Sequence, residues 1–175
     1  MGLREHRAAA HRRVRVAVVT FSDTRDAAHD HSGNAIDAAL AQRGHEVVAR
    51  IILREDDVTV SEGIDALLLR NDIDAIVASG GTGIAPRDRA YDFFQRRYES
   101  ELPGFGELFR ALSYADIGSA AMASRASAGV ARGKLVFSLP GSQAAVQLGL
   151  DKLILPELGH LVGQLRSATA PEDRP

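Results

Sequence analysis

A glycine-rich turn that ends in an arginine–aspartate pair lies near the middle of this 175-residue chain. It covers Ser79–Asp88 (SGGTGIAPRD) and follows the short apolar run 74–78, which is typical of a buried strand. Glycines directly after a strand let the backbone turn sharply and bring its N–H groups close to a ligand. Arg87 adds a cation and Asp88 a possible metal ligand. The pattern therefore predicts a phosphate site with a divalent cation.

The turn follows neither of two familiar nucleotide-binding patterns. No Gly-Lys-Ser/Thr ends it, so it is not a P-loop. Pro86 stands where the third glycine of a dinucleotide-binding fingerprint would fall after Gly81 and Gly83. The glycines by themselves fit a plain structural connection equally well. Because such a connection has less need of Arg87 and Asp88 at the start of the next helix, the whole stretch favours a functional site.

The composition is that of an ordinary globular domain, with 45% hydrophobic and 25% charged residues. The net charge of −2 gives no support to nucleic-acid binding through bulk electrostatics. Cysteine is absent from the sequence, which excludes disulfides, thiol catalysis and cysteine-ligated metal. No apolar run approaches the ~18 residues that a membrane span needs. We therefore expect a cytoplasmic protein with neither nucleic-acid nor membrane partners.

The chain divides into one domain and two tails. Residues 1–13 are rich in arginine and histidine and lack an apolar signal core. We expect a flexible basic tail there, with a transit peptide as the alternative. Residues 14–166 carry the pattern of a single folded domain. Residues 167–175 include two prolines and predict a flexible C-terminal tail.

Within the domain, apolar runs alternate with segments of helical spacing. The predicted strands cover residues 14–21, 47–53, 74–78 and 134–139. The predicted helices cover residues 32–43, 88–99, 107–112, 142–155 and 157–166, together with one that Thr59 or Ser61 caps. Pro103–Gly106 should break the chain and Pro156 should separate the last two helices, while residues 119–131 give no clear pattern. The alternation predicts a three-layer α/β/α fold around a doubly wound, mostly parallel sheet.

Ligands of such sheets bind outside the carboxyl ends of the strands. Polar loops are expected at four of these ends, namely Ser22-Asp23, Asp56-Asp57, Ser79–Asp88 and Leu139–Ser142. Their convergence would assemble carboxylates and anion-binding turns in one crevice.

Taken in order, these stretches resemble the MoaB/Mog family of molybdenum-cofactor biosynthesis proteins, whose pattern also occurs in the G domain of gephyrin. The matching stretches are Thr20–Asp23, Ser32-Gly33, Ser79–Asp88, Pro103–Arg110 (PGFGELFR), Ser124-Arg125 and Leu139–Ser142. Each motif is weak, but together they follow the family's order and span about residues 14–166. Residues 101–118 look closer to the MoaB branch than to the Mog branch.

The resemblance implies a MoaB/Mog-like fold that binds molybdopterin. In active members it also implies transfer of AMP from ATP to the terminal phosphate of molybdopterin with Mg²⁺, which releases pyrophosphate. A homo-oligomer is implied as well, and the hexamer of MoaB-type members is favoured over the trimer of Mog-type members. Other molybdenum-cofactor enzymes would be further partners. The alternative is a non-catalytic molybdopterin-binding or carrier oligomer, because a fold and its binding site need not carry the activity.

By the resemblance, Asp56 and Asp88 match the family's functional carboxylates. We expect both to be catalytic and to bind or organise Mg²⁺, because hard cations take oxygen ligands. A shift of one residue from Asp56 to Asp57 remains open. The structural alternatives are a solvated surface position for Asp56 and a helix N-cap for Asp88.

The remaining expected contacts are to phosphate groups. Backbone N–H groups of the turn, together with one hydroxyl, would bind phosphate at Gly80, Gly81, Thr82 and Gly83. Arg87 would add positive charge to the same site.

Further binding residues are expected on neighbouring loops and on the helix after residue 106. They are Ser22, Asp23, Glu107, Pro140, Gly141 and Ser142. Asp23 would equally fit an Asx turn and Ser142 a helix N-cap. Arg110 and Arg125 would either supply charge to the pterin phosphate or form salt bridges between subunits.

One departure from the family pattern concerns the residues after the arginine–aspartate pair. Many members have Thr-Pro-Glu where this chain has Ala90-Tyr91-Asp92. The missing hydroxyl at Ala90 removes one expected polar contact, whereas Asp92 keeps the acidic character.

Overall fold

The computed structural model describes residues 13–168. In chain order the elements are β1 (Arg15–Phe21), α2 (His31–Gln42), β2 (Glu46–Leu53), α3 (Asp57–Leu69), β3 (Ala75–Ser79), α4 (Ala90–Gln95), β4 (Ser100–Glu101), α5 (Pro103–Ile117), the 3₁₀ helix η2 (Gly118–Ala123), β5 (Ser127–Ala131), β6 (Lys134–Leu139), α6 (Gln143–Gly149), the π-helical turn η3 (Leu150–Ile154) and α7 (Leu155–Ala168).

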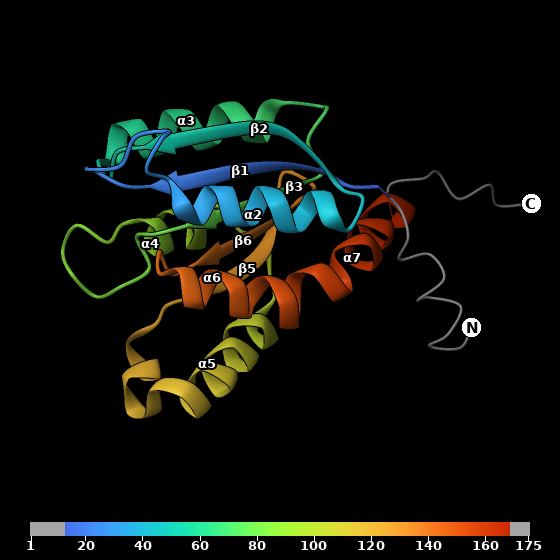
Figure 1. The fold of residues 1–175 in the computed structure, drawn as a ribbon. Coiled ribbons are helices and arrows are strands. Elements are labelled where there is room, and N and C mark those ends of the chain that lie inside the picture. Colours follow the sequence, from blue (N-terminus) through green and yellow to red (C-terminus); the bar gives the residue numbers. More distant parts are fainter. Residues whose placement is uncertain (1–12, 169–175) are drawn as a thin grey trace, which may run out of the picture.

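One sheet of six strands organises the molecule, in the order β2-β1-β3-β6-β5-β4 (Figure 1). The four strands from β2 to β6 pair in parallel, and β5 and β4 add an antiparallel edge. β3 and β6 are buried along their whole length, which explains their nearly continuous apolar sequences. The predicted α/β fold with a mostly parallel sheet is confirmed.

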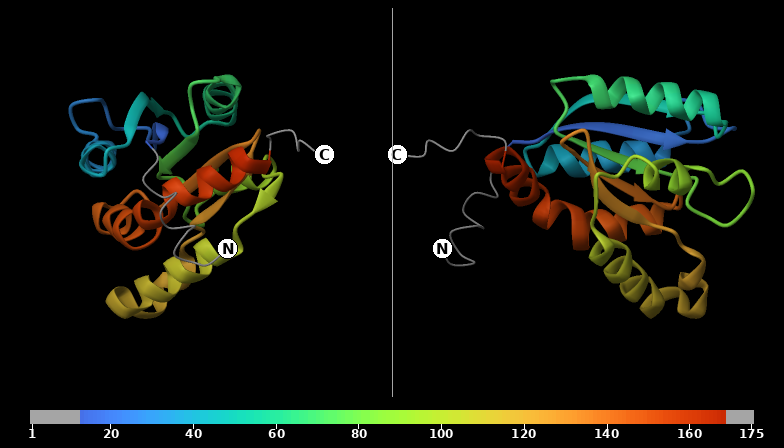
Figure 2. Two further views of the ribbon diagram at one scale, coloured as in Figure 1. Left: turned by 90° about the vertical axis from the view of Figure 1, so that its right-hand side faces the viewer. Right: turned by 180° about the vertical axis from the view of Figure 1, so that it is seen from behind.

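Helices cover both faces of the sheet and complete the three layers (Figure 2). Side chains of β1 alternate between two apolar cores: Val16 and Val18 belong to one, and Ala17 and Val19 to the other. The first core contains buried residues of α2, α5, α6 and α7, and the second contains those of α3 and α4. Burial on both faces fixes the sheet between the helical layers.

The sequence does not predict the antiparallel strands β4 and β5. β5 has the sequence SAGVA, whose small residues have little preference for strands. Its pairing with β6 depends instead on a two-residue turn at Arg132-Gly133. Both residues have positive φ, 47° and 68°, as a type I′ hairpin turn requires.

Two prolines also act differently from the prediction. Pro103 is the first residue of α5, so the helix begins before the predicted Glu107. This position suits proline because its missing N–H would have no helical partner there. Pro156 does not separate two helices, since α6, η3 and α7 are continuous. The π-helical turn, in which Leu155 N–H donates to the carbonyl oxygen of Leu150, lies directly before this proline.

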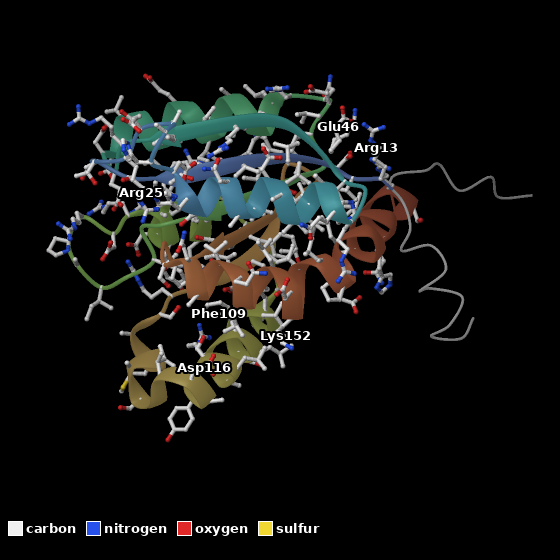
Figure 3. All side chains as sticks on the ribbon, in the orientation of Figure 1. Arg13, Arg25, Glu46, Phe109, Asp116 and Lys152 are labelled. Carbon is white, nitrogen blue, oxygen red and sulfur yellow. The ribbon has the colours of Figure 1, made fainter. Side chains whose placement is uncertain are left out.

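The expected tails lie almost wholly outside the described residues. Residues 1–12 and 169–175 are not described, whereas Arg13 forms an ion pair of 3.1 Å with Glu46 (Figure 3). At the other end α7 continues to Ala168. Among the helices of residues 13–168, none has the length and apolar character to cross a membrane.

The register of the central strands brings their carboxyl ends to one edge. Thr20 of β1 pairs with Ser79 of β3, which pairs with Leu139 of β6. The next residue, Gly80, has φ +99° and donates its N–H to the carbonyl oxygen of Leu139 at 2.9 Å. A Cβ at this position would lie 2.5 Å from the carbonyl oxygen of Phe21. The glycine turn is therefore packed tightly between the ends of β1 and β6.

Asp74 stabilises the opposite end of the parallel strands, directly before β3. Its carboxylate accepts hydrogen bonds from the backbone and guanidinium of Arg15 and forms a 2.6 Å ion pair with Arg166 of α7. The Asp74 side chain is only 8% exposed. Burial raises the pKa of Asp74, but the hydrogen bonds from Arg15 and Arg166 outweigh it and lower the pKa to about 2. The ionised carboxylate therefore stabilises the fold.

Replacing Asp74 with asparagine is expected to reduce the free energy of unfolding at pH 7 by about 2 kcal/mol. The folded-state pKa lies below the unfolded value of 3.8, so this stabilisation is present above pH 4 and is lost as the pH falls towards about 2. Urea unfolding at several pH values measures it. Asp72→Asn, which removes an exposed pair with Arg70, is the control and should change little. Equal losses in both variants would contradict the account.

Candidate functional site

A cleft of about 470 Å³ opens at the carboxyl ends of the central strands. It is lined by Phe21, Ser22, Thr24, Arg25, Glu55, Gly80, Gly81, Thr82, Gly83, Asp88, Ser124, Pro140, Gly141 and Ser142. Most of the predicted site residues are thus brought together by the loops after β1, β3 and β6. Asp23, Asp56, Arg87 and Glu107 do not line the cleft.

The glycine turn presents unpaired backbone donors. The N–H of Gly80 is used by Leu139, but within residues 13–168 the N–H groups of Gly81, Thr82 and Gly83 donate to no protein atom. Gly81 has φ +64°, and its Cα faces the methyl group of Ala90 so closely that a Cβ would lie 2.8 Å from it. Backbone donors gathered in a turn of this kind bind anions.

Asp88 turns its carboxylate back over the glycine turn. Its Oδ2 accepts a hydrogen bond of 2.9 Å from Ala85 N, and a Cβ on Gly83 would lie 2.6 Å from the same oxygen. α4 begins at Ala90, with Arg89 in the capping position and no side-chain cap. The predicted helix over residues 88–99 is therefore too long, and the alternative role of Asp88 as its N-cap is excluded.

The sequence predicts Asp56 in the cleft, but its carboxylate caps α3 and the residue does not line the cleft. Its Oδ1 accepts from Thr59 N at 2.8 Å and its Oδ2 from Thr59 Oγ1 at 2.7 Å. These hydrogen bonds lower the pKa of Asp56. The helix thus begins at Asp57 rather than at a Thr59 or Ser61 cap. Asp57 forms an exposed pair with Arg89.

The second carboxylate residue that lines the cleft with Asp88 is Glu55, which sequence reasoning missed. Glu55 lines the cleft, and its Oε2 is buried without a hydrogen-bond partner. Burial raises the pKa of Glu55, and the negative charges of Asp88 and Asp23 raise it further, while Arg87 opposes them. The sequence did hold a signal for this. Asp56 followed by Thr59 fits a helix N-cap, which would have assigned the Asp56 side chain to α3 and left Glu55 for the cleft.

The loop after β1 contacts the loop that carries Glu55. Asp23 Oδ1 accepts a hydrogen bond of 3.0 Å from Glu55 N, so it links two loops rather than closing an Asx turn. Ser22 Oγ accepts from Thr24 N and Arg25 N and shapes the start of the loop.

Arg25, also missed from the sequence, is the cationic side chain among the described residues that line the cleft. Figure 3 places it beyond the carboxyl end of β1. Its guanidinium donates to Ser32 Oγ at 3.2 Å and reaches the carbonyl oxygen of Gly141 at 3.5 Å. Ser142 accepts from Ala145 N and caps α6, in agreement with its structural alternative. A cation thus lies beside the second polar turn, Pro140–Ser142.

Glu107 lies apart from the cleft. It lines a cavity of about 100 Å³ beside α5, together with Tyr91 and Arg110. Arg110 points its guanidinium towards the carbonyl oxygens of Ser124 and Ala126, each at 3.4 Å. The structure therefore brings Glu107 to Arg110 but not to the predicted residues that line the cleft.

A family model described as a probable molybdopterin binding domain matches residues 17–160. The chain belongs to this family. It is 43% identical over 166 residues to molybdenum cofactor biosynthesis protein B of Halalkalibacterium halodurans, covering 94% of this chain and 98% of that protein. It is 44% identical over 167 residues to the protein of the same description from Bacillus subtilis, covering 95% and 98%.

The fold agrees with that family. A crystal structure of a molybdenum cofactor biosynthesis protein B matches with a TM-score of 0.86 at 42% identity, covering 89% of this chain and 98% of that chain. The family predicted from the motifs is confirmed. In this chain, the residues that line the cleft include two carboxylates, Glu55 and Asp88, and the cation Arg25.

The two adjacent carboxylates after β2 should respond oppositely to removal of their charge. Glu55→Gln is expected to raise the thermal midpoint at pH 7 without added metal, because burial and the charges of Asp88 and Asp23 disfavour an ionised Glu55. Asp56→Ala is expected to lower it, because α3 loses its cap. Calorimetry measures both midpoints. A destabilised Glu55→Gln variant beside an unchanged Asp56→Ala variant would contradict these placements.

Proposed function

We propose that this chain binds molybdopterin and transfers AMP from ATP to its terminal phosphate with Mg²⁺, releasing pyrophosphate. The observation that carries the proposal is the cleft in which Glu55 and Asp88 lie beside the unpaired N–H groups of the glycine turn. Family membership supports molybdopterin as the ligand. The names of the relatives similarly support a role in molybdenum cofactor biosynthesis.

The residues present fit a magnesium ion. Magnesium in phosphate-transfer sites is held by one or two carboxylates together with substrate phosphates. The buried Oε2 of Glu55 has no partner, and the charge of Asp88 disfavours its ionised form, so a divalent cation held by these two carboxylates would offset both penalties. No cluster of three or more acidic, histidine or cysteine side chains in residues 13–168 is arranged to hold a metal. We assign Glu55 and Asp88, in place of Asp56, as the two ligands that the protein would contribute, and substrate phosphates would supply the others.

The reaction brings two anions together, so positioning and charge neutralisation are its main requirements. A phosphate oxygen of the pterin forms a bond to the α-phosphorus of ATP, and the bond from that phosphorus to pyrophosphate breaks. The N–H groups of Gly81, Thr82 and Gly83 would bind one anion. Arg25, beside Pro140–Ser142, would bind the other. Bound Mg²⁺ would supply positive charge to the triphosphate.

No residue is needed as a general base. A phosphate monoester is already largely ionised near neutral pH. The protein's task is then to hold the attacking oxygen close to the α-phosphorus, which by itself removes much of the barrier. Glu55 and Asp88 accordingly act as ligands rather than as proton acceptors.

The experiment that tests the proposal is incubation with molybdopterin, ATP and Mg²⁺, followed by detection of adenylylated molybdopterin and pyrophosphate. We expect product that disappears without Mg²⁺ and falls at least ~100-fold in Asp88→Asn. Asp72→Asn, which removes a carboxylate far from the cleft, is the control and should keep full turnover. Tight pterin binding without product would contradict the transferase and leave a carrier.

A homo-oligomer is also proposed, with a hexamer favoured over a trimer. α5 extends away from the sheet (Figure 1). Together with η2 it exposes four large apolar side chains, Leu108, Tyr114, Ile117 and Met122. Apolar groups gathered on one projecting element are typical of an interface between chains.

Ile117→Asp is expected to shift the oligomer towards the monomer, because it places a charge among these apolar side chains. Sedimentation velocity measures the change. Leu69→Asp is the matched control, since Leu69 is similarly exposed, 64% against 59%, but lies at the end of α3. An unchanged assembly in Ile117→Asp, or equal dissociation in both variants, would overturn this interface.

A further inference from the structure

Arg125 binds the loop that carries Asp88 from outside the cleft. It lies between η2 and β5 and is not among the residues that line the cleft. Its Nε donates to the carbonyl oxygen of Gly83 at 2.9 Å, and its Nη2 donates to the carbonyl oxygen of Asp88 at 2.7 Å. Its backbone N–H donates to the carbonyl oxygen of Thr82 at 3.1 Å. One residue thus holds both ends of the segment 82–88.

The guanidinium is itself held in place. Its Nη1 lies 3.1 and 3.2 Å from the two carboxylate oxygens of Asp92, on the helix that follows the loop. The ring of Tyr91 lies against it, with 4.8 Å from the guanidinium carbon to the ring centroid. Asp92 therefore orients the donors of Arg125 towards the loop.

The loop needs such support because it has few internal bonds. Within the segment 82–88, Asp88 N donates to the carbonyl oxygen of Ala85 and Ala85 N donates to the Asp88 carboxylate, each at 2.9 Å. Neither connects the loop to the sheet. Arg125 supplies that connection, since it belongs to the chain that leads into β5.

These contacts distinguish Arg125 from an arginine that binds phosphate. All three guanidinium nitrogens already donate within the chain, and the side chain is only 26% exposed. A phosphate held by two guanidinium N–H groups would have to displace at least one of these protein acceptors. The sequence-based alternatives, charge for the pterin phosphate or a salt bridge between subunits, both require a guanidinium that is free.

We infer that Arg125 is a positioning residue that fixes the segment 82–88 in its ligand-binding shape before any ligand arrives. It keeps the N–H groups of the glycine turn and the Asp88 carboxylate directed at the cleft. Its consequence for turnover rests on the proposed adenylyl transfer, whereas its consequence for the loop does not.

A lysine cannot replace this arrangement. The planar guanidinium directs donors at fixed angles to two carbonyl oxygens and a carboxylate at once, whereas an ammonium is a single point on a flexible stem. Arg125→Lys therefore keeps the charge and removes the geometry. Asp92→Asn keeps Arg125 and removes the carboxylate that orients it, which gives a second, milder variant.

Arg97 provides a matched control. It is 24% exposed and pairs through 2.8 and 2.9 Å hydrogen bonds with Asp65, which is 46% exposed. The pair of Arg125 with Asp92 is 26% and 44% exposed. Arg97 also contacts an aromatic ring, that of Phe93. Arg97→Lys therefore removes a comparable pair that makes no contact with the segment 82–88.

Hydrogen–deuterium exchange of the ligand-free protein tests the loop directly. Arg125→Lys is expected to speed exchange in peptides covering residues 81–90 by about tenfold, because the two guanidinium hydrogen bonds to the loop are lost. Asp92→Asn should speed it by a smaller factor, because the guanidinium stays but loses the carboxylate that orients it. Arg97→Lys should leave these peptides unchanged. Wild-type exchange in Arg125→Lys and Asp92→Asn would overturn the inference, as would equal acceleration in Arg97→Lys.

Steady-state kinetics then separates positioning from binding. Arg125→Lys should lower kcat about 10- to 100-fold while the KM for ATP changes little, because the misplaced groups act in the transition state. A raised KM with unchanged kcat would overturn the inference in favour of phosphate binding by Arg125. If the wild type forms no product, the proposed transfer fails, and the exchange result still decides the role of Arg125 in the loop.

Discussion

The alignment of three parallel strands is the constraint on which the site depends. Thr20, Ser79 and Leu139 lie side by side in β1, β3 and β6, so the loops that follow them leave the sheet at one edge. A slip of one residue in either pairing would turn the apolar side chains of that strand to the wrong core. Two apolar cores, one on each face, therefore fix the register, and the register places the glycine turn against Phe21 and the turn at Pro140.

The acidic residues of the cleft lower the stability of the ligand-free protein. Glu55 has a buried oxygen without a partner and lines the same cleft as Asp88, and burial and the charge of Asp88 both raise the pKa of Glu55, while Arg25 lies beside Gly141. A fold selected for stability would pair or remove such a carboxylate. The proposed ligands, a cation at the two carboxylates and anionic groups along the turns, would offset this cost. Arg125, which does not line the cleft, donates hydrogen bonds to the loop that carries Asp88.

The sequence predicts the fold well because its signals are local. Apolar runs identify β1, β3 and β6, and glycines directly after a strand identify the turn. The signals fail where contacts between distant residues decide. Four charged residues follow β2, and only the start of α3 shows that Asp56 caps the helix and leaves Glu55 to the cleft. β5 is a strand because β6 pairs with its small residues, and the role of Arg125 depends on carbonyl oxygens far along the chain.

The central claim is that Glu55 and Asp88 together hold a divalent cation, and binding of Mn²⁺ in place of Mg²⁺ tests it most directly. Electron paramagnetic resonance counts free Mn²⁺ as it is titrated into protein with ATP. We expect Glu55→Gln to weaken Mn²⁺ binding by about tenfold or more, while Asp56→Asn binds as the wild type does. Weakened binding in Asp56→Asn with unchanged binding in Glu55→Gln would contradict the account.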